Sequence, residues 1–172
     1  MSRSTTPPVG RISSPDEART DYAGAVYGSL LAASVLATAT TLGDYPRLEL
    51  VLVLLVTGLV FWATHVYARL AGERPVGRPW RRGEIRRVAL HEWPIVQAAA
   101  LPAAVVAVSP LLGLDLNATE WLALGVAVAQ QVFWASLGAV HSGARRGQMI
   151  AEGAVNLLLG LIIVAAKAAL SH

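Results

Sequence analysis

The chain has 172 residues, of which 55% are hydrophobic and only 15% are charged, and its mean hydropathy is +0.53. Soluble domains have roughly 45–50% apolar and about 25% charged residues, so the composition argues against a soluble domain. Cysteine is absent, which excludes disulfides, thiolate metal sites and cysteine nucleophiles.

In chain order, residues 1–20 come first; they are rich in Ser, Thr, Pro and Arg and are predicted to form a disordered cytoplasmic arm. Residues 21–172 are predicted to form a transmembrane domain. Its five apolar stretches are residues 22–42, 48–70, 93–114, 120–141 and 149–170. Each is close to the roughly 20 residues that a helix needs to cross about 30 Å of hydrocarbon. Because backbone amides in lipid need internal partners and no alternating barrel pattern occurs, the fold class is predicted as an all-α polytopic helical bundle.

Breaks in the pattern place the boundaries. Glycines and prolines between residues 72 and 83 exclude one continuous helix from the second stretch to the third. Asp115 supplies N-cap chemistry before the fourth stretch. Within the third stretch, Pro102 is predicted to kink the helix and to free a carbonyl one turn earlier.

The arginines predict the orientation. Seven occur near the connection of the second and third stretches: Arg69, Arg74, Arg78, Arg81, Arg82, Arg86 and Arg87. Arg145 and Arg146 lie between the fourth and fifth, whereas residues 113–120 carry acids and no basic residue. The positive-inside rule therefore predicts five spans, N-in and C-out, in a bacterial-type plasma (inner) membrane. Because the basic residues lie between apolar stretches, they favour membrane topology over nucleic-acid binding.

A cleaved signal sequence is the alternative for the first stretch, since residues 37–39 read Ala-Thr-Ala. The long preceding arm and the acids Asp16, Glu17 and Asp21 beside the apolar run argue against cleavage.

Ionisable residues gather toward the predicted cytoplasmic face. The three outward helices begin with Asp21, Glu92 and Glu152, and the two inward helices carry His65 and His141 near their cytoplasmic ends. One polar residue per outward helix lies just deeper. The candidate transport-site residues are thus His65, His141, Glu92, Glu152, Asn156, Gln97 and Tyr27. Imidazole and carboxylate suit a divalent transition metal or a proton relay, so the first four are also metal-ligand candidates, and no other cofactor is predicted.

Structural roles compete with this interpretation. An acid at a helix N-terminus is stabilised by the helix dipole by about 0.3–1 kcal/mol. Gln130 and Gln131 are predicted to make interhelical hydrogen bonds, and at most one of them can point squarely at the bundle axis. Lys167, near the outer end of the last stretch, is predicted to extend its ammonium toward the membrane surface.

Small residues recur at four-residue spacing in two stretches, at Gly24, Gly28 and Ala32 and at Gly125 and Ala129. Such faces serve either packing within the chain or a homodimer seam. Walker loops, dinucleotide-binding glycine motifs, nucleophile elbows and HExxH are all absent, so no enzyme is predicted.

The chain, especially HEWPIVQAAALP at residues 91–102 and the Asn156 helix, resembles small actinobacterial integral membrane proteins of unassigned function. More distantly, the five-span plan, ALPAAVVAVSPLLG and the final GAVHSGARRGQMIAEGAVNLLLGLIIV are similar to the vacuolar iron transporter family. That resemblance implies divalent-metal export from the cytoplasm by a dimer. The first stretch lacks that family's acid-bearing helix centre, and a short arginine-rich connection replaces its glutamate-rich segment, so no metal site carries over.

Two functions remain open from the sequence. One is a small cation transporter or channel-like protein that alternately exposes the cytoplasmic-side polar site. The other is a non-transporting accessory or lipid-contacting scaffold protein whose polar groups only fasten helices together.

Overall fold

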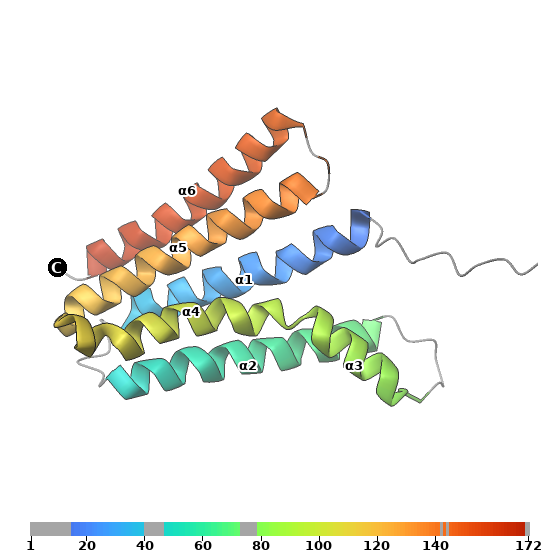
Figure 1. Cartoon of the computed structure of the whole chain (residues 1–172), viewed down its shortest axis with the longest axis horizontal. Helices are drawn as coiled ribbons and strands as arrows, with labels where there is room; N and C mark the ends of the chain where they lie inside the picture. Colours follow the sequence, from blue (N-terminus) through green and yellow to red (C-terminus); the bar gives the residue numbers. More distant parts are fainter. Residues whose placement is uncertain (1–14, 40–46, 73–78, 142, 144, 171–172) are drawn as a thin grey trace, which may run out of the picture.

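In this computed structural model the described residues are 15–39, 47–72, 79–141, 143 and 145–170. They form helices joined by short connections, with no strand among them (Figure 1). The elements are α1 (Pro15–Ala39), α2 (Arg47–Gly72), α3 (Arg82–His91), α4 (Pro94–Val108), the 3-10 helix η2 (Ser109–Leu112), α5 (Leu116–His141) and α6 (Arg146–Leu170).

The predicted all-α architecture is confirmed. The five helices that are long and apolar enough to cross a membrane are Tyr22–Ala39, Arg47–Gly72, Pro94–Leu112, Leu116–His141 and Arg146–Ala169. Each coincides with one of the stretches expected from the sequence.

The helix ends differ from the predicted ones by up to about two turns. α5 starts one turn earlier than predicted because Asp115 caps it: its carboxylate accepts a hydrogen bond from the amide of Ala118 at 2.6 Å. α1 starts at Pro15, inside the predicted arm, of which residues 1–14 lie outside the described part.

The helix α3 has no counterpart among the predicted elements. It occupies ten residues of the arginine-rich connection and is amphipathic. Val88 on its inner side packs against Val66 and Leu70 of α2, whereas Arg82 and Arg86 are exposed. Only one side of this short helix is apolar, so its sequence contains no long apolar stretch.

The helix α1 is central to the bundle, because it packs against α2, α4, α5 and α6. The remaining major contacts join α2 to α4, α4 to α5 and α5 to α6. Chain direction alternates, so α1, α4 and α6 run one way and α2 and α5 run the other (Figure 1). We call the end that holds α3 and the α5–α6 connection the α3 end, and the opposite end the Asp115 end.

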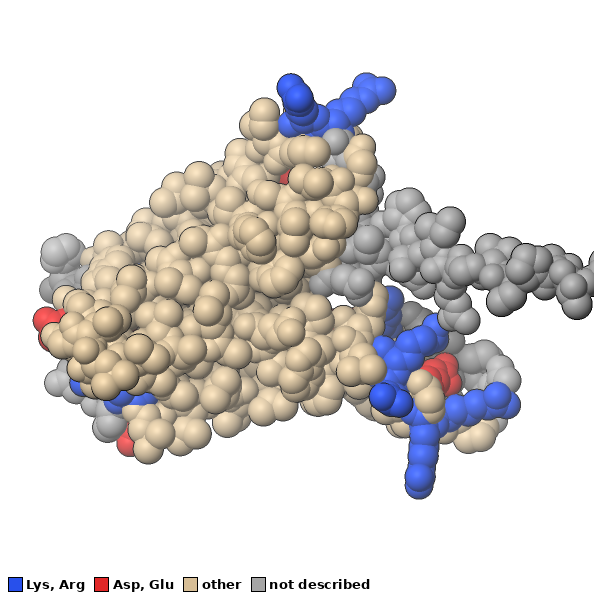
Figure 2. Space-filling view, viewed as in Figure 1, with Lys and Arg blue, Asp and Glu red and all other residues tan. Residues whose placement is uncertain are grey.

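The charged side chains on the surface lie toward the two ends of the bundle. Figure 2 shows most of the visible basic side chains at the α3 end, fewer at the Asp115 end, and a broad uncharged band across the helices. Large apolar side chains are exposed along this band on α2 and α6, including Val56, Val60, Leu158 and Ile162. In water this surface would be costly at about 25 cal/mol per Å², whereas lipid removes that cost. The chain is therefore a multi-pass membrane protein.

The glycine stripe of α1 serves packing within the chain. A Cβ atom at Gly28 would lie 2.8 Å from the carbonyl oxygen of Ile95 and 2.9 Å from the Cβ of Ala98, so only glycine lets α1 and α4 approach this closely. Gly125 and Ala129 of the other stripe are exposed on α5, and nothing lies within 4 Å of the Cβ position of Gly125. A homodimer through that face stays a prediction.

Candidate functional site

Glu92 is buried at the α3 end, in the bend between α3 and α4. Its carboxylate forms an ion pair with the guanidinium of Arg69 from α2 at 2.6 Å. The indole of Trp62 fastens the same junction by donating a hydrogen bond to the carbonyl of Ala89 at 2.9 Å. Glu92 therefore holds α3 and the start of α4 to α2, a fixed partnership that occupies one of the candidate carboxylates.

The two candidate histidines face different sides of α1. The ring of His65 lies 5.2 Å from the ring of Tyr27, and its Nδ1 lies 3.0 Å from the carbonyl of Phe61. The ring of His141 lies 5.3 Å from that of Tyr22. Tyr22 and Tyr27 are five residues apart, which places them about 140° apart around the helix. The structure therefore does not bring His65 and His141 together.

The two candidate residues on α6, Glu152 and Asn156, bond to each other, and Asn156 also bonds to α5. The amide of Asn156 donates to the backbone carbonyl of Glu152 at 2.9 Å, and its side-chain oxygen accepts from Gln131 at 3.2 Å. Gln97 is exposed on α4, and Tyr27 is 41% exposed on α1. Across the described residues, no three His, Asp or Glu side chains converge in a group that could hold a metal ion.

Gln130 occupies the centre of the bundle, where it joins three helices. Pro102 has no N–H to bond the carbonyl of Ala98, and the amide of Gln130 donates to that carbonyl at 3.1 Å. The same amide lies 3.1 Å from the hydroxyl oxygen of Ser29 in α1. The carbonyl that Pro102 was predicted to free thus has a partner from α5, and α4 continues as a helix through this position.

Gln131 points to a different neighbour, as adjacent helical positions require. Its amide donates to the backbone carbonyl of Asn156 in α6 at 2.9 Å. The prediction that both glutamines make interhelical hydrogen bonds is confirmed. Gln130 bonds to α1 and α4, and Gln131 bonds to α6, so the pair fastens α5 to three neighbours.

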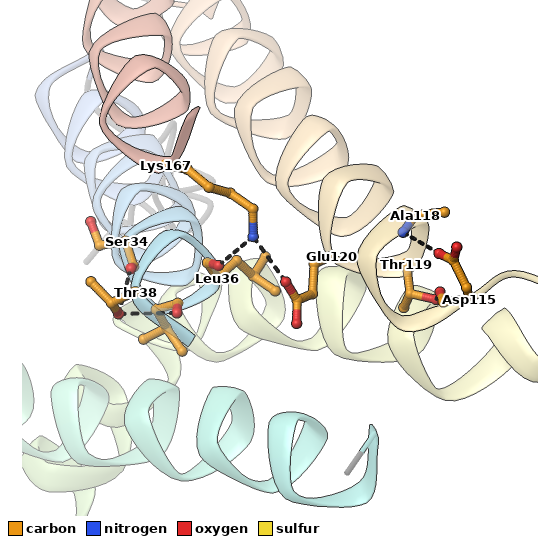
Figure 3. Close-up of polar contacts among 9 residues, drawn as sticks. Ser34, Leu36, Thr38, Asp115, Ala118, Thr119, Glu120 and Lys167 are labelled. Carbon is orange, nitrogen blue, oxygen red and sulfur yellow. Dashed lines mark hydrogen bonds and ion pairs between the residues drawn. The ribbon is translucent and has the colours of Figure 1, made fainter. Parts of the chain in front are cut away.

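Lys167 lies inside the protein near the Asp115 end, and the prediction that it extends toward the membrane surface was wrong. Its ammonium is 3.1 Å from the carboxylate of Glu120 in α5 and donates to the carbonyl of Leu36 in α1 at 3.0 Å (Figure 3). Lys167 is 1% exposed and Glu120 is 2% exposed. The ring of Trp121 lies 5.5 Å from the ammonium. A carboxylate, a carbonyl and an aromatic face together offset the cost of burying the charge.

A signal for this ion pair was present in the sequence. Glu120 starts an inward helix and Lys167 ends an outward one, so the predicted topology places both at the same depth. Pairing of opposite charges within spans is the usual outcome in membranes. Only the packing of α6 against both α5 and α1 determines that the two side chains meet.

Arg47, at the start of α2, also bonds to a different segment of the chain. Its guanidinium donates to the hydroxyl oxygen of Ser109 at 3.1 Å and to the carbonyl of Leu114 at 2.5 Å. Ser109 in turn donates to the carbonyl of Val106, which Pro110 leaves without its helical partner. The polar groups freed by proline at this end are thereby satisfied.

Two adjoining hollows lie along α4 and α5. One, of about 570 Å³, lies between Gln97, Leu101 and Ala104 of α4 and Phe133 and Trp134 of α5. The other, of about 460 Å³, lies toward the α3 end and is lined by Arg87, His91 and Tyr22 among others. Trp134 lines both hollows.

Comparisons of the chain with protein-family models, with curated proteins and with solved structures return no match. The resemblances to small actinobacterial membrane proteins and to the vacuolar iron transporter family stay predictions.

The buried ion pair generates the first testable prediction. Lys167→Met should lower the free energy of unfolding by about 3–5 kcal/mol, because it leaves the Glu120 carboxylate buried without its counter-ion. The double variant Lys167→Met with Glu120→Leu should recover most of this loss. Equilibrium unfolding in detergent micelles measures both, with the exposed Glu49→Gln as a control. Wild-type stability of the single variant would show that the pair contributes nothing.

The second prediction concerns Gln130 and the carbonyl of Ala98. Gln130→Leu should destabilise the protein by about 1–2 kcal/mol, since it removes hydrogen bonds to two helices. In a Pro102→Ala background the restored N–H can bond that carbonyl, so the same substitution should cost less. A double-mutant cycle from unfolding midpoints measures the difference. Additive losses would contradict the role of Gln130 as the partner of that carbonyl.

Proposed function

We propose that this chain is a non-transporting accessory or scaffold protein that contacts lipid, with its polar interior used to fasten helices. One observation carries the proposal. Apart from Thr119, every buried polar or charged side chain in the described part of the chain bonds to another helix. A transport site needs polar groups that exchange partners with a cargo, whereas each of these side chains already bonds within the bundle, with only the side-chain oxygens of Gln130 and Gln131 left to accept a bond.

The surroundings of the histidines support the same proposal. His65 and His141 lie on α2 and α5, each against a different tyrosine of α1, and the acids Glu92 and Glu152 belong to separate clusters. Their imidazoles have local backbone partners at the carbonyls of Phe61 and Leu137. Because His65 and His141 lie in separate surroundings, interface and packing roles are favoured for both histidines.

We place the protein in a plasma (inner) membrane with five spans, N-in and C-out. The support is the asymmetry of charge, because Arg81, Arg82, Arg86, Arg87, Arg145 and Arg146 all belong to the α3 end. Arginine-rich connections favour the cytoplasmic side. The α3 end is then cytoplasmic, and Asp115 lies on the outer side.

A cation transporter is the second candidate, and the ion pair of Lys167 with Glu120 favours it. Ionisable residues within a span commonly mark ion or proton pathways. In such a protein the carboxylate of Glu120 would exchange the ammonium for an incoming cation. The two candidates differ in whether any cation crosses the membrane.

Flux measurement in proteoliposomes separates the candidates. We expect proton and divalent-metal flux no higher than in protein-free vesicles, because the buried charged groups Glu92, Glu120 and Lys167 are already paired. We also expect His65→Ala and His141→Ala to change only the melting temperature. Flux through the wild-type protein that both substitutions abolish, at unchanged melting temperature, would overturn the scaffold proposal and establish transport.

The orientation has its own test, which uses the natural absence of cysteine. Gly83→Cys places a single thiol on exposed α3, and Asn117→Cys places one at the exposed start of α5. In intact cells a membrane-impermeant maleimide should label the second variant only, because the arginine-rich end faces inward. Lysed cells, in which both should react, provide the control. Labelling of Gly83→Cys alone would reverse the orientation.

A further inference from the structure

The two hollows along α4 and α5 meet at Trp134, which lines both, and they differ in their chemistry. The polar end lies at the α3 end of the bundle, between Arg87 and His91 of α3 and Tyr22 of α1. The mostly apolar end lies between Leu101 and Ala104 of α4 and Phe133 of α5, and Gln97 and Gln130 also line it. We call the two hollows together the α4–α5 groove.

The apolar end has the length and walls for a hydrocarbon chain. From Pro94 to Ala104, α4 rises about 15 Å, which is half of the roughly 30 Å of hydrocarbon in a bilayer. The small side chain of Ala104 leaves space that the rings of Phe133 and Trp134 border from α5. An acyl chain from the leaflet at the α3 end would therefore reach from the interface to about the bilayer centre.

The polar end has the groups that recognise a phosphate. A guanidinium binds phosphate oxygens through two parallel hydrogen bonds. In a zwitterionic headgroup the attached cation offsets the charge of the phosphate, so an anionic headgroup is attracted more strongly. The imidazole of His91 lines the same hollow. Tyr22 and Trp134 have ring centroids 5.8 Å apart, and such rings favour the level of the lipid headgroups.

The surroundings complement an anion rather than a cation. Arg81, Arg82, Arg86 and Arg87 all belong to or border α3, and they outnumber its single acid, Glu84. Each basic residue near the surface attracts anionic lipid by about 1 kcal/mol. Charge thus draws anionic lipid to this end of the molecule, and the groove supplies a place for one molecule.

We propose that the α4–α5 groove binds one anionic phospholipid, with its phosphate at Arg87 and His91 and one acyl chain along Leu101, Ala104 and Phe133. The inference rests on the proposed lipid-contacting function and names its ligand. The bound lipid would join α3, α4 and α5 at the membrane surface. The basic end would then hold one lipid headgroup at a fixed position instead of attracting many headgroups nonspecifically.

The test is native mass spectrometry of the full chain in detergent micelles, titrated with phosphatidylglycerol or with phosphatidylcholine of the same acyl chains. We expect one phosphatidylglycerol per chain to be retained under conditions that remove phosphatidylcholine. Arg87→Gln should weaken this affinity by about tenfold, as the loss of one charge-assisted contact predicts. Arg82→Gln removes the same charge outside the groove and should leave the affinity close to that of the wild type.

A second pair of variants tests the apolar end without changing charge. Ala104→Phe fills the groove and should reduce phosphatidylglycerol binding, whereas Ala107→Phe adds the same ring at an exposed position outside the lining and should not. Melting temperatures close to the wild type confirm that both variants fold. Equal losses in Arg87→Gln and Arg82→Gln, or wild-type binding by Ala104→Phe, would overturn the site and leave only diffuse attraction to the basic end.

Failure here is distinguishable from failure of the proposed function. Absence of a retained lipid together with absence of cation flux overturns the groove and leaves the scaffold proposal standing. Cation flux with a retained lipid overturns the scaffold proposal and leaves the groove.

Discussion

Charged and polar side chains inside a membrane are stabilised by partners within the protein, and this constraint organises the bundle. The ion pair of Lys167 with Glu120 meets it most visibly, because both charges are almost fully buried. The ammonium also bonds to the carbonyl of Leu36, so one side chain joins α6 to α5 and α1. The stability of a helix as lipid-exposed as α6 depends on such contacts, since lipid supplies no hydrophobic drive between helices.

The same constraint explains how the bundle tolerates proline. Pro102 and Pro110 each deprive a carbonyl of its helical partner, at Ala98 and at Val106. The amide of Gln130 takes the first, and the hydroxyl of Ser109 takes the second. Fixed partnerships of this kind consume the polar residues that a transport pathway would need free. That is why the arrangement favours a scaffold over a transporter.

Much of the fold was predictable from the sequence, and the site was much less so. Five apolar stretches, the Asp115 cap and the interhelical roles of Gln130 and Gln131 follow from local pattern and from the chemistry of amides in lipid. The candidate site required seven residues to converge, which depends on the rotation of each helix about its axis. Tyr22 and Tyr27 lie about 140° apart around α1, so His141 and His65, which contact them, face different sides of that helix.

The sequence by itself determined that this chain is a membrane protein of apolar helices with most of its arginines in two of the connections, because length, hydropathy and charge are properties of segments read one at a time. Tertiary structure alone decided which side chains meet. It paired Lys167 with Glu120, turned Gln130 toward the carbonyl of Ala98, and placed Arg87 in the lining of a hollow beside Trp134. The physical reason is that such pairings depend on how helices distant in sequence pack. At Gly28 and Ile95 the absence of a single Cβ atom permits that packing.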